Sequence, residues 1–214
     1  MDERRHDYVK ELQKAIHYPL SELKESFEKE FSILVSYSKN KRVLDVGCGT
    51  GRPADRLAHY CKQLVGIDNN KDMLHIAREV LEHETKVRLL EMDALAMEFG
   101  DNEFDFVYST YNLIGSINEK ELLIEEMKRV AKKEGVVAVF SWKQDNTTTT
   151  FLKKYYPHIG ITIKSITNEK TVTDKHIFER ISSDYVKQLF INQGLKDISV
   201  KDVGPVWYVV IGIK

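Results

Sequence analysis

The chain of 214 residues has few cysteines and no long apolar run. Its two cysteines, Cys48 and Cys61, form no C-x-x-C pair, which predicts reduced thiols in a cytoplasmic protein and no disulfide framework. The seven histidines show no metal-ligand spacing, so we expect no metal site. No stretch approaches eighteen apolar residues, and no apolar signal segment follows the charged N-terminus. We therefore expect neither secretion nor a membrane span.

The chain also has no excess of charge of either sign. Its 32 basic and 33 acidic residues give a formal net charge of -1. A nearly neutral chain generates no global field that attracts a polyanion, so nothing here supports a nucleic-acid partner. The content of 42% hydrophobic and 30% charged residues is ordinary for a globular protein. The length suits one α/β domain, alone or with a small cap, and predicts no oligomeric state.

Glycine is scarce, with eleven residues in the chain, yet three of them stand at alternate positions 47, 49 and 51. The apolar run before them, from Val43 to Val46, predicts a buried strand of a parallel sheet. Glycines there allow a sharp turn and the close approach of a ligand. Arg52 occupies the place of the third small residue of a dinucleotide fingerprint, and no Gly-Lys-Ser/Thr follows as in a P-loop.

Strand and helix patterns alternate from residue 42 onward. Predicted strands cover 43–46, 64–67, 87–92, 104–109 and 136–140, with helices over 53–60 and 73–81 and a helix behind a capping box of Ser116 and Glu119. This order predicts a doubly wound parallel sheet. A helix over 183–193 ends at Gly194, and the strands 195–200 and 206–213 are joined closely enough to require antiparallel pairing. Two helices are predicted within residues 1–40, the second beginning at Ser21. They either pack over the ligand edge or simply cap the sheet.

The segment Asp45-Val46-Gly47-Cys48-Gly49-Thr50-Gly51 resembles motif I of the class I S-adenosylmethionine-dependent methyltransferases. An ordinary glycine-rich turn of an unrelated α/β domain is the alternative. The resemblance covers residues 42–142, and more loosely the C-terminal helix and strands. It implies a seven-stranded, mostly parallel, Rossmann-like sheet with an antiparallel C-terminal hairpin strand. It also implies a methyltransferase domain over 41–214, after a helical cap at 1–40, and S-adenosyl-L-methionine as the cofactor.

The resemblance assigns cofactor contacts to acids at strand ends. Asp68, which stands 23 residues after Asp45, would accept the ribose hydroxyls, with Asn69 beside it. Asp93 and Ala94 would face the adenine, although Asp93 could instead cap the following turn. Met73 would pack against the adenine or belong to the core.

The remaining cofactor candidates lie in the glycine turn and after the fourth strand. Asp45 would hold the turn or meet the cofactor ammonium. Arg52 would reach the cofactor carboxylate or stand exposed at a helix start. The turn and the strand end supply further candidates: Gly47, Cys48, Gly49, Gly51, Ser109 and Thr110.

Methyl transfer leaves little catalytic signature, because a sulfonium methyl is already an activated electrophile. The reaction needs a nucleophile in line with the methyl group and the exclusion of water. Tyr111 and Asn112, after the fourth strand, could orient an acceptor, although helix entry and core contact explain them equally well. The N/D-P-P-Y/F sequence of DNA amino-methyltransferases is absent here, which removes the best reason to expect a nucleobase acceptor.

Residues 143–180 interrupt the alternation and predict a β-ribbon over 159–166 and 171–177. The resemblance implies an acceptor lid here, and His158 and His176 are candidates for its pocket. Seven basic and four acidic residues give this segment a charge of +3, which favours an anionic acceptor or simply reflects a solvated surface.

The sequence is thus identified as a methyltransferase that modifies N or O of a small molecule. The alternatives are an RNA or protein methyltransferase and a non-catalytic partner subunit that binds the cofactor; a dehydrogenase is least favoured.

Overall fold

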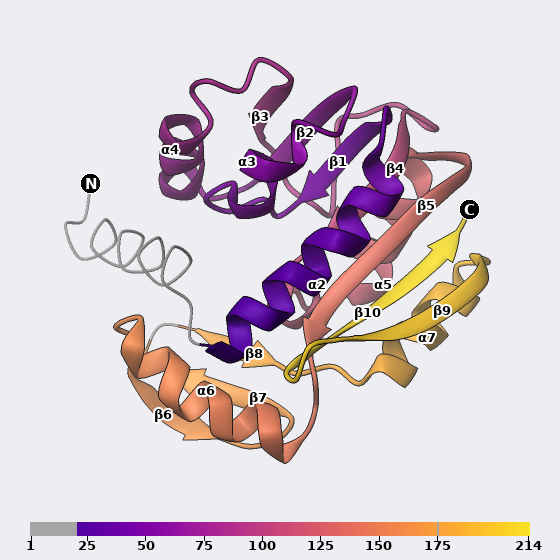
Figure 1. Cartoon of the computed structure of the whole chain (residues 1–214). Helices are drawn as coiled ribbons and strands as arrows, with labels where there is room; N and C mark the ends of the chain where they lie inside the picture. The colour runs from indigo at the N-terminus through magenta and orange to yellow at the C-terminus, as the bar shows by residue number, and fades with distance from the viewer. Residues whose placement is uncertain (1–20, 175) are drawn as a thin grey trace.

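The computed structural model describes residues 21–174 and 176–214, so the first predicted helix, before Pro19, lies outside the described part. A seven-stranded sheet runs through the molecule in the order β3-β2-β1-β4-β5-β10-β9 (Figure 1). Its strands are β1 Arg42–Val46, β2 Gln63–Asp68, β3 Val87–Glu91, β4 Phe104–Ser109, β5 Ala131–Trp142, β9 Lys196–Val203 and β10 Trp207–Ile213. The pairs among β1 to β5 are parallel, and β10 runs antiparallel to both neighbours. The predicted fold class is confirmed.

Helices cover both faces of this sheet. They are α2 Ser21–Ser38, α3 Arg52–Leu57, α4 Lys71–Val80, α5 Lys120–Val130 and α7 Ser183–Asn192. Side chains of α2, α3 and α4 pack in one core cluster, and those of α5 and α7 pack in the other. Val43 and Leu44 of β1 belong to different clusters, because successive side chains of a strand point to opposite faces. Among the described helices, none is long and apolar enough to cross a membrane.

The strand order reverses between β1 and β4. The chain proceeds outward from β1 to β2 and β3, and then returns to place β4 on the other side of β1. In open α/β sheets, ligands bind outside the carboxyl ends of the strands at such a switch point. The glycine turn that follows β1 lies at this point.

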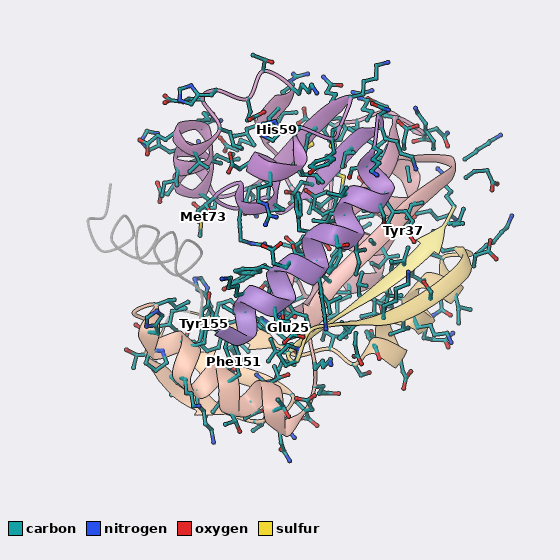
Figure 2. The ribbon with its side chains drawn as sticks, in the orientation of Figure 1. Glu25, Tyr37, His59, Met73, Phe151 and Tyr155 are labelled. Carbon is teal, nitrogen blue, oxygen red and sulfur yellow. The ribbon has the colours of Figure 1, made fainter. Side chains whose placement is uncertain are left out.

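A separate small layer follows β5, and we call it the lid (Figure 1). It consists of α6 Asn146–His158 and an antiparallel three-stranded sheet of β6 Ile163–Ile166, β7 Lys170–Thr173 and β8 Ile177–Glu179. An antiparallel ribbon is present as predicted, but β6 begins at Ile163 instead of residue 159, and the predicted strand 171–177 is divided between β7 and β8. A helix that was not predicted precedes the ribbon. Asp145 begins α6 by accepting a hydrogen bond from the Thr148 N–H at 2.7 Å. Phe151 and Tyr155 then pack into the core cluster that contains the side chains of α2 (Figure 2).

Several predicted boundaries were wrong, among them the end of β9, which lies at Val203 instead of Val200. The capping box does not form: a short 3₁₀ turn, η1 Leu113–Gly115, precedes α5, which begins at Lys120 without a side-chain cap. Strand β5 begins at Ala131 instead of Val136, because a register shift beside β4 admits the polar residues that precede Gly135. Helix α3 ends at Leu57, three residues before the predicted end at 60.

Candidate cofactor and acceptor site

The turn after β1 is shaped by its glycines. Gly47, Gly49 and Gly51 have φ angles of 70°, 54° and 80°, in the left-handed region where a side chain is disfavoured. The N–H groups of Gly47 and Cys48 both donate to the Ile67 carbonyl, at 2.8 and 2.9 Å, which fastens the turn to β2. A Cβ atom at Gly49 would meet nothing within 4 Å. The backbone at Gly49 therefore faces open space.

The Cys48 thiol lies against Gly66 of β2. A Cβ atom at Gly66 would stand only 3.0 Å from the Cys48 sulfur, so glycine makes the space that this side chain fills. Burial raises the pKa of Cys48 well above its ordinary value, and Asp45 and Asp68 add to the effect. Cys48 and Cys61 are both free and buried.

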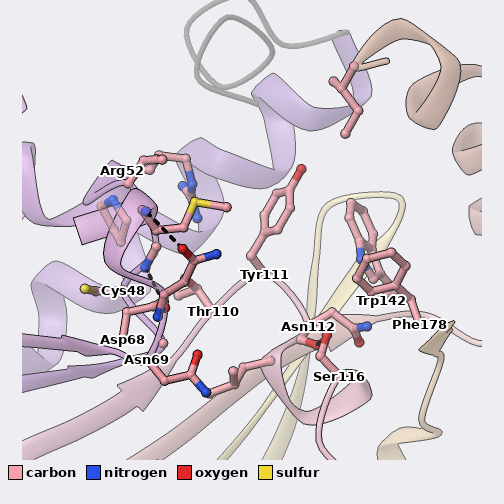
Figure 3. A pocket seen from close by; sticks show the side chains of 18 of the residues that line it. Cys48, Arg52, Asp68, Asn69, Thr110, Tyr111, Asn112, Ser116, Trp142 and Phe178 are labelled. Atoms are coloured by element: carbon pink, nitrogen blue, oxygen red, sulfur yellow. Dashed lines mark hydrogen bonds between the residues drawn. The ribbon is translucent and has the colours of Figure 1, made fainter. Parts of the chain in front are cut away.

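Asp68 ends β2 and holds two backbone segments together. One carboxylate oxygen accepts the Gly49 N–H at 2.9 Å and the other accepts the Asn70 N–H at 2.8 Å (Figure 3). The acid thereby fixes the glycine turn against the start of α4, a task that the sequence did not reveal. Burial raises its pKa, and the two backbone donors work against that shift.

Two adjoining cavities open at this edge of the sheet. The lid cavity, of about 310 Å³, reaches from the glycine turn to the lid, and the strand-end cavity, of about 330 Å³, reaches to the loop after β3. Both linings contain the same five residues: Gly47, Asp68, Asn69, Leu113 and Ser116. The two cavities therefore adjoin along the carboxyl ends of β1 to β4, and we call them together the recess.

Most of the predicted cofactor residues line this recess. In the lid cavity they are Gly47, Cys48, Gly49, Arg52, Asp68, Asn69, Met73 and Thr110. Asp93 and Ala94 line the strand-end cavity. Asp93 also accepts the Leu95 N–H at 2.9 Å, so its predicted turn-capping role is confirmed beside its position in the cavity.

Three predicted cofactor residues lie behind the recess. Asp45, Gly51 and Ser109 are buried and belong to neither lining. At Gly51 a Cβ atom would stand 2.7 Å from the Leu81 side chain, so this glycine lets α4 pack closely. The Ser109 hydroxyl is buried without a hydrogen-bond partner among the described residues.

Arg52 is not the exposed helix-start residue that was one alternative. Its side chain is 14% exposed, and Nη2 donates to both carboxylate oxygens of Glu30, at 2.7 and 2.9 Å. The guanidinium lies 4.1 Å from the ring centroid of Phe27. Glu30 is fully buried and was not among the residues predicted from the sequence. The available signal was its position on the apolar face of α2, three residues after Phe27.

Asp45 is a buried carboxylate with neither oxygen in a hydrogen bond of good geometry. It stands opposite Tyr108 in the register of β1 and β4. Burial raises its pKa to about 7; the Tyr108 hydroxyl and Arg52 oppose the shift, whereas Glu30 and Asp68 add to it. Asp45 thus lies within electrostatic reach of two other acids, Glu30 and Asp68, and of the Arg52 guanidinium, an excess of acidic groups that suits a ligand with positive charge.

Tyr111 and Asn112 follow β4 with φ angles of 55° and 65°, a strained pair of left-handed residues at the cavity wall. The Tyr111 ring meets Trp142 and Trp207 edge to face, and its hydroxyl bonds to that of Tyr155.

The Asn112 side chain is fully engaged within the fold. Its amide nitrogen donates to the Glu179 carbonyl at 2.9 Å, and its oxygen accepts the Ser141 hydroxyl at 2.6 Å. The side chain thereby ties the end of β4 to β5 and to the lid. The core-contact interpretation of both residues is confirmed, and acceptor contact stays a prediction.

The two candidate histidines lie outside this recess. His158 and His176 are exposed and line neither cavity. Within 21–174 and 176–214, no basic residue of the lid lines either cavity. The same residues contain no group of three or more histidines, cysteines or acids that could hold a metal ion.

Comparisons with known proteins agree with this geometry. Residues 43–135 match the family described as a methyltransferase domain. The demethylmenaquinone methyltransferase of Staphylococcus carnosus is 26% identical over 172 residues, which cover 76% of this chain and 71% of that protein. The phosphatidylethanolamine N-methyltransferase of Cereibacter sphaeroides is 36% identical over 105 residues, which cover 48% of this chain and 51% of that protein.

The fold also matches a solved structure. The crystal structure of an S-adenosylmethionine-dependent methyltransferase from Aquifex aeolicus superimposes with a TM-score of 0.71 at 21% identity, covering 94% of this chain and 97% of the other. Together with the glycine turn and the sheet order, these matches show that residues 43–135 form a methyltransferase domain. The chain as a whole is similar to S-adenosylmethionine-dependent methyltransferases, and its cofactor is S-adenosylmethionine.

Proposed function

We propose that this enzyme transfers the methyl group of S-adenosylmethionine to N or O of a small molecule bound beneath the lid. The observation that carries the proposal is that the two cavities adjoin at the strand ends and have five lining residues in common. A cofactor lying along the strand ends would place its adenosine in the strand-end cavity. Its methionine portion would then enter the lid cavity, where the acceptor also binds.

The residues of the recess fit this cofactor. Asp68 retains free lone pairs for the ribose hydroxyls after accepting two backbone N–H groups. Asp93 and Ala94 would face the adenine from the strand-end cavity. The cofactor carries a sulfonium and an ammonium, and these positive groups would compensate the buried carboxylates that include Asp45. The open backbone at Gly49 gives the cofactor room to approach.

The bound cofactor supplies an electrophilic methyl group, and the chain supplies position and shielding. Residues 143–180 would serve as the acceptor lid within a methyltransferase domain of residues 41–214, with the N-terminal helical part before it. Tyr111 and Asn112 would orient the acceptor at the end of β4, where the lid contacts the cofactor edge. Lid side chains such as Ile159 and Phe178 would keep water from the reacting atoms.

The relatives do not select the acceptor, because their names refer to a quinone precursor and to a phospholipid. Two alternatives therefore stand beside the proposal: methylation of RNA or protein, and a cofactor-binding subunit without catalysis. The nearly balanced charge of the chain favours neither a polyanionic acceptor nor strong salt dependence.

A labelled-methyl assay separates these possibilities. The enzyme and labelled S-adenosylmethionine are incubated together with one fraction at a time: metabolites, tRNA or protein. We expect label in the metabolite fraction. Label confined to tRNA or protein contradicts the proposed acceptor, and no transfer together with a stable heteromeric complex supports the partner-subunit alternative.

Calorimetry with S-adenosylmethionine tests the proposed cofactor site independently. Asp68→Ala should weaken binding at least tenfold, because the ribose hydroxyls lose a charged acceptor worth roughly 1.5–3 kcal/mol. The matched control is Asp55→Ala, which removes an exposed acid from the first turn of α3. Unchanged affinity in the Asp68 variant would refute the assignment.

A further inference from the structure

The acceptor end of the lid cavity is built from aromatic rings that come from four separate segments. Tyr111 follows β4, Trp142 ends β5, Tyr156 lies on α6 and Phe178 lies on β8. The rings of Tyr111 and Trp142, both labelled in Figure 3, stand 5.6 Å apart at 65°. The rings of Tyr156 and Phe178 stand 5.8 Å apart at 20°. Core and lid thus each contribute one ring pair to the same cavity.

Aliphatic side chains complete this wall. Ile159 and Ile161, from the segment between α6 and β6, line the cavity and are themselves almost fully buried. The packing of the rings on one another fixes their planes, since Tyr111 also meets Trp207 and Tyr156 also meets Tyr155. The result is an apolar pocket whose ring faces and ring edges are held in place before a ligand enters.

The charged groups that line the lid cavity already have partners. Arg52 Nη2 donates to both carboxylate oxygens of Glu30, and the Asp68 carboxylate accepts two backbone N–H groups. Both lining groups lie at the glycine-turn end of the cavity, and the Arg52 guanidinium stands 6.0 Å from the centroid of the Tyr111 ring. A phosphate or carboxylate on the acceptor would be desolvated beside the rings while the charge of Arg52 is already balanced by buried Glu30, which is unfavourable.

We propose that the acceptor is a small, uncharged, planar molecule: an aromatic or heteroaromatic ring with its nucleophilic N or O at the ring edge. This inference rests on the proposed function and specifies its substrate class. Aromatic ligands gain from the edge-to-face and offset-stacked contacts that this pocket offers. A cationic amine fits less well, because it would lie beside the cofactor sulfonium in a medium of low dielectric constant, and a protonated nitrogen has no lone pair to attack the methyl group.

The first test compares acceptors that differ in planarity and charge. Initial rates of transfer from labelled S-adenosylmethionine are measured with three planar acceptors, aniline, imidazole and phenol. The comparison acceptors are cyclohexylamine, cyclohexanol and phosphoethanolamine, which lack a planar ring. The labelled product formed in the metabolite fraction is also identified by mass spectrometry. We expect the product from the metabolite fraction to contain a planar ring. We also expect kcat/KM for the best of the three ring acceptors to be at least tenfold above the value for any of the three comparison acceptors.

The second test changes one ring of the pocket. Phe178→Leu keeps an apolar side chain but removes the ring, and it should lower kcat/KM for the ring acceptor about fivefold, the size of one aromatic contact. Phe178→Tyr restores the ring and should restore the rate. The control is Ile177→Leu on the same strand, whose side chain is 59% exposed and lines neither cavity. Cofactor affinity, measured by calorimetry, should be the same in all three variants.

The outcomes separate this inference from the function on which it rests. Transfer to an aliphatic amine or a phosphate-bearing acceptor would overturn the planar acceptor and leave small-molecule methylation standing. Equal rates for Phe178→Leu and wild type with the identified acceptor would also overturn it. Absence of transfer to every fraction, with the cofactor bound, would instead overturn the proposed function.

Discussion

We expect the free energy of unfolding of the cofactor-free protein to depend on pH through the buried carboxyl of Asp45. Burial raises the pKa of its carboxyl from 3.8 to about 7. A raised pKa means that the stability linked to this group is fully present below pH 3.8 and is lost as the pH rises to about 7. A shift of 7 − 3.8, about 3 pH units, corresponds to roughly 4 kcal/mol at 1.36 kcal/mol per unit.

The variant Asp45→Asn removes this ionisation while keeping the shape of the side chain. Between pH 5 and pH 7 the wild type should lose roughly 2 kcal/mol of unfolding free energy through Asp45, because the slope of 1.36 kcal/mol per unit flattens as the folded-state carboxyl itself ionises near pH 7. The pH dependence of the variant should be shallower by that amount. The measurement is urea unfolding without cofactor at pH 5, 6, 7 and 8.

The matched control for this series is Asp105→Asn. Burial of Asp105 is outweighed by hydrogen bonds from Lys132 and from the Arg42 N–H, which lower its pKa below 3.8. It is therefore ionised in both the folded and the unfolded chain throughout pH 5 to 8, and its replacement should leave the slope unchanged. An identical slope in wild type and Asp45→Asn would refute the assignment of this titration to Asp45.

Two further predictions concern Glu30 and Asn112. Glu30→Gln should destabilise the protein by roughly 3 kcal/mol in urea unfolding, because Arg52 is left buried without its counter-ion. Glu28→Gln, which breaks an exposed pair with Arg56, should cost under about 1 kcal/mol, and equal effects would contradict the difference in burial. Asn112→Ala should reduce turnover at least tenfold in the labelled-methyl assay while calorimetry shows unchanged cofactor affinity, because its amide ties the end of β4 to the lid. Full turnover with the true acceptor would remove this role.

The parallel half of the fold was predictable because its signals are local. A buried strand such as β1 is a short apolar run, and the positive φ angles at Gly47, Gly49 and Gly51 require glycine. The acids Asp68 and Asp93 were found by their place at the ends of strands, which a parallel sheet brings to one edge.

The lid and the buried ion pair were less predictable because their signals are not local. Four consecutive threonines, which favour strands, follow the first residue of helix α6, and its apolar residues Phe151 and Tyr155 gain stability by packing against Trp142, which lies outside the helix on β5. Glu30 pairs with Arg52, which is 22 residues away in the sequence, and the local sequence around neither residue indicates that its charged side chain is buried. The sequence also did not indicate which of the candidate residues line the recess. Ser109 and Thr110 are adjacent in the chain, yet only Thr110 lines a cavity.

The burial of Cys48 and Cys61 has a practical consequence for studying the lid. These are the only two cysteines in the sequence, and both thiols are shielded from solvent with pKa values raised by burial. A thiol-reactive dye therefore has no exposed native target in the folded chain. The substitution Ile177→Cys would place one accessible attachment point on β8, so a fluorophore there could report lid movement in otherwise unaltered enzyme.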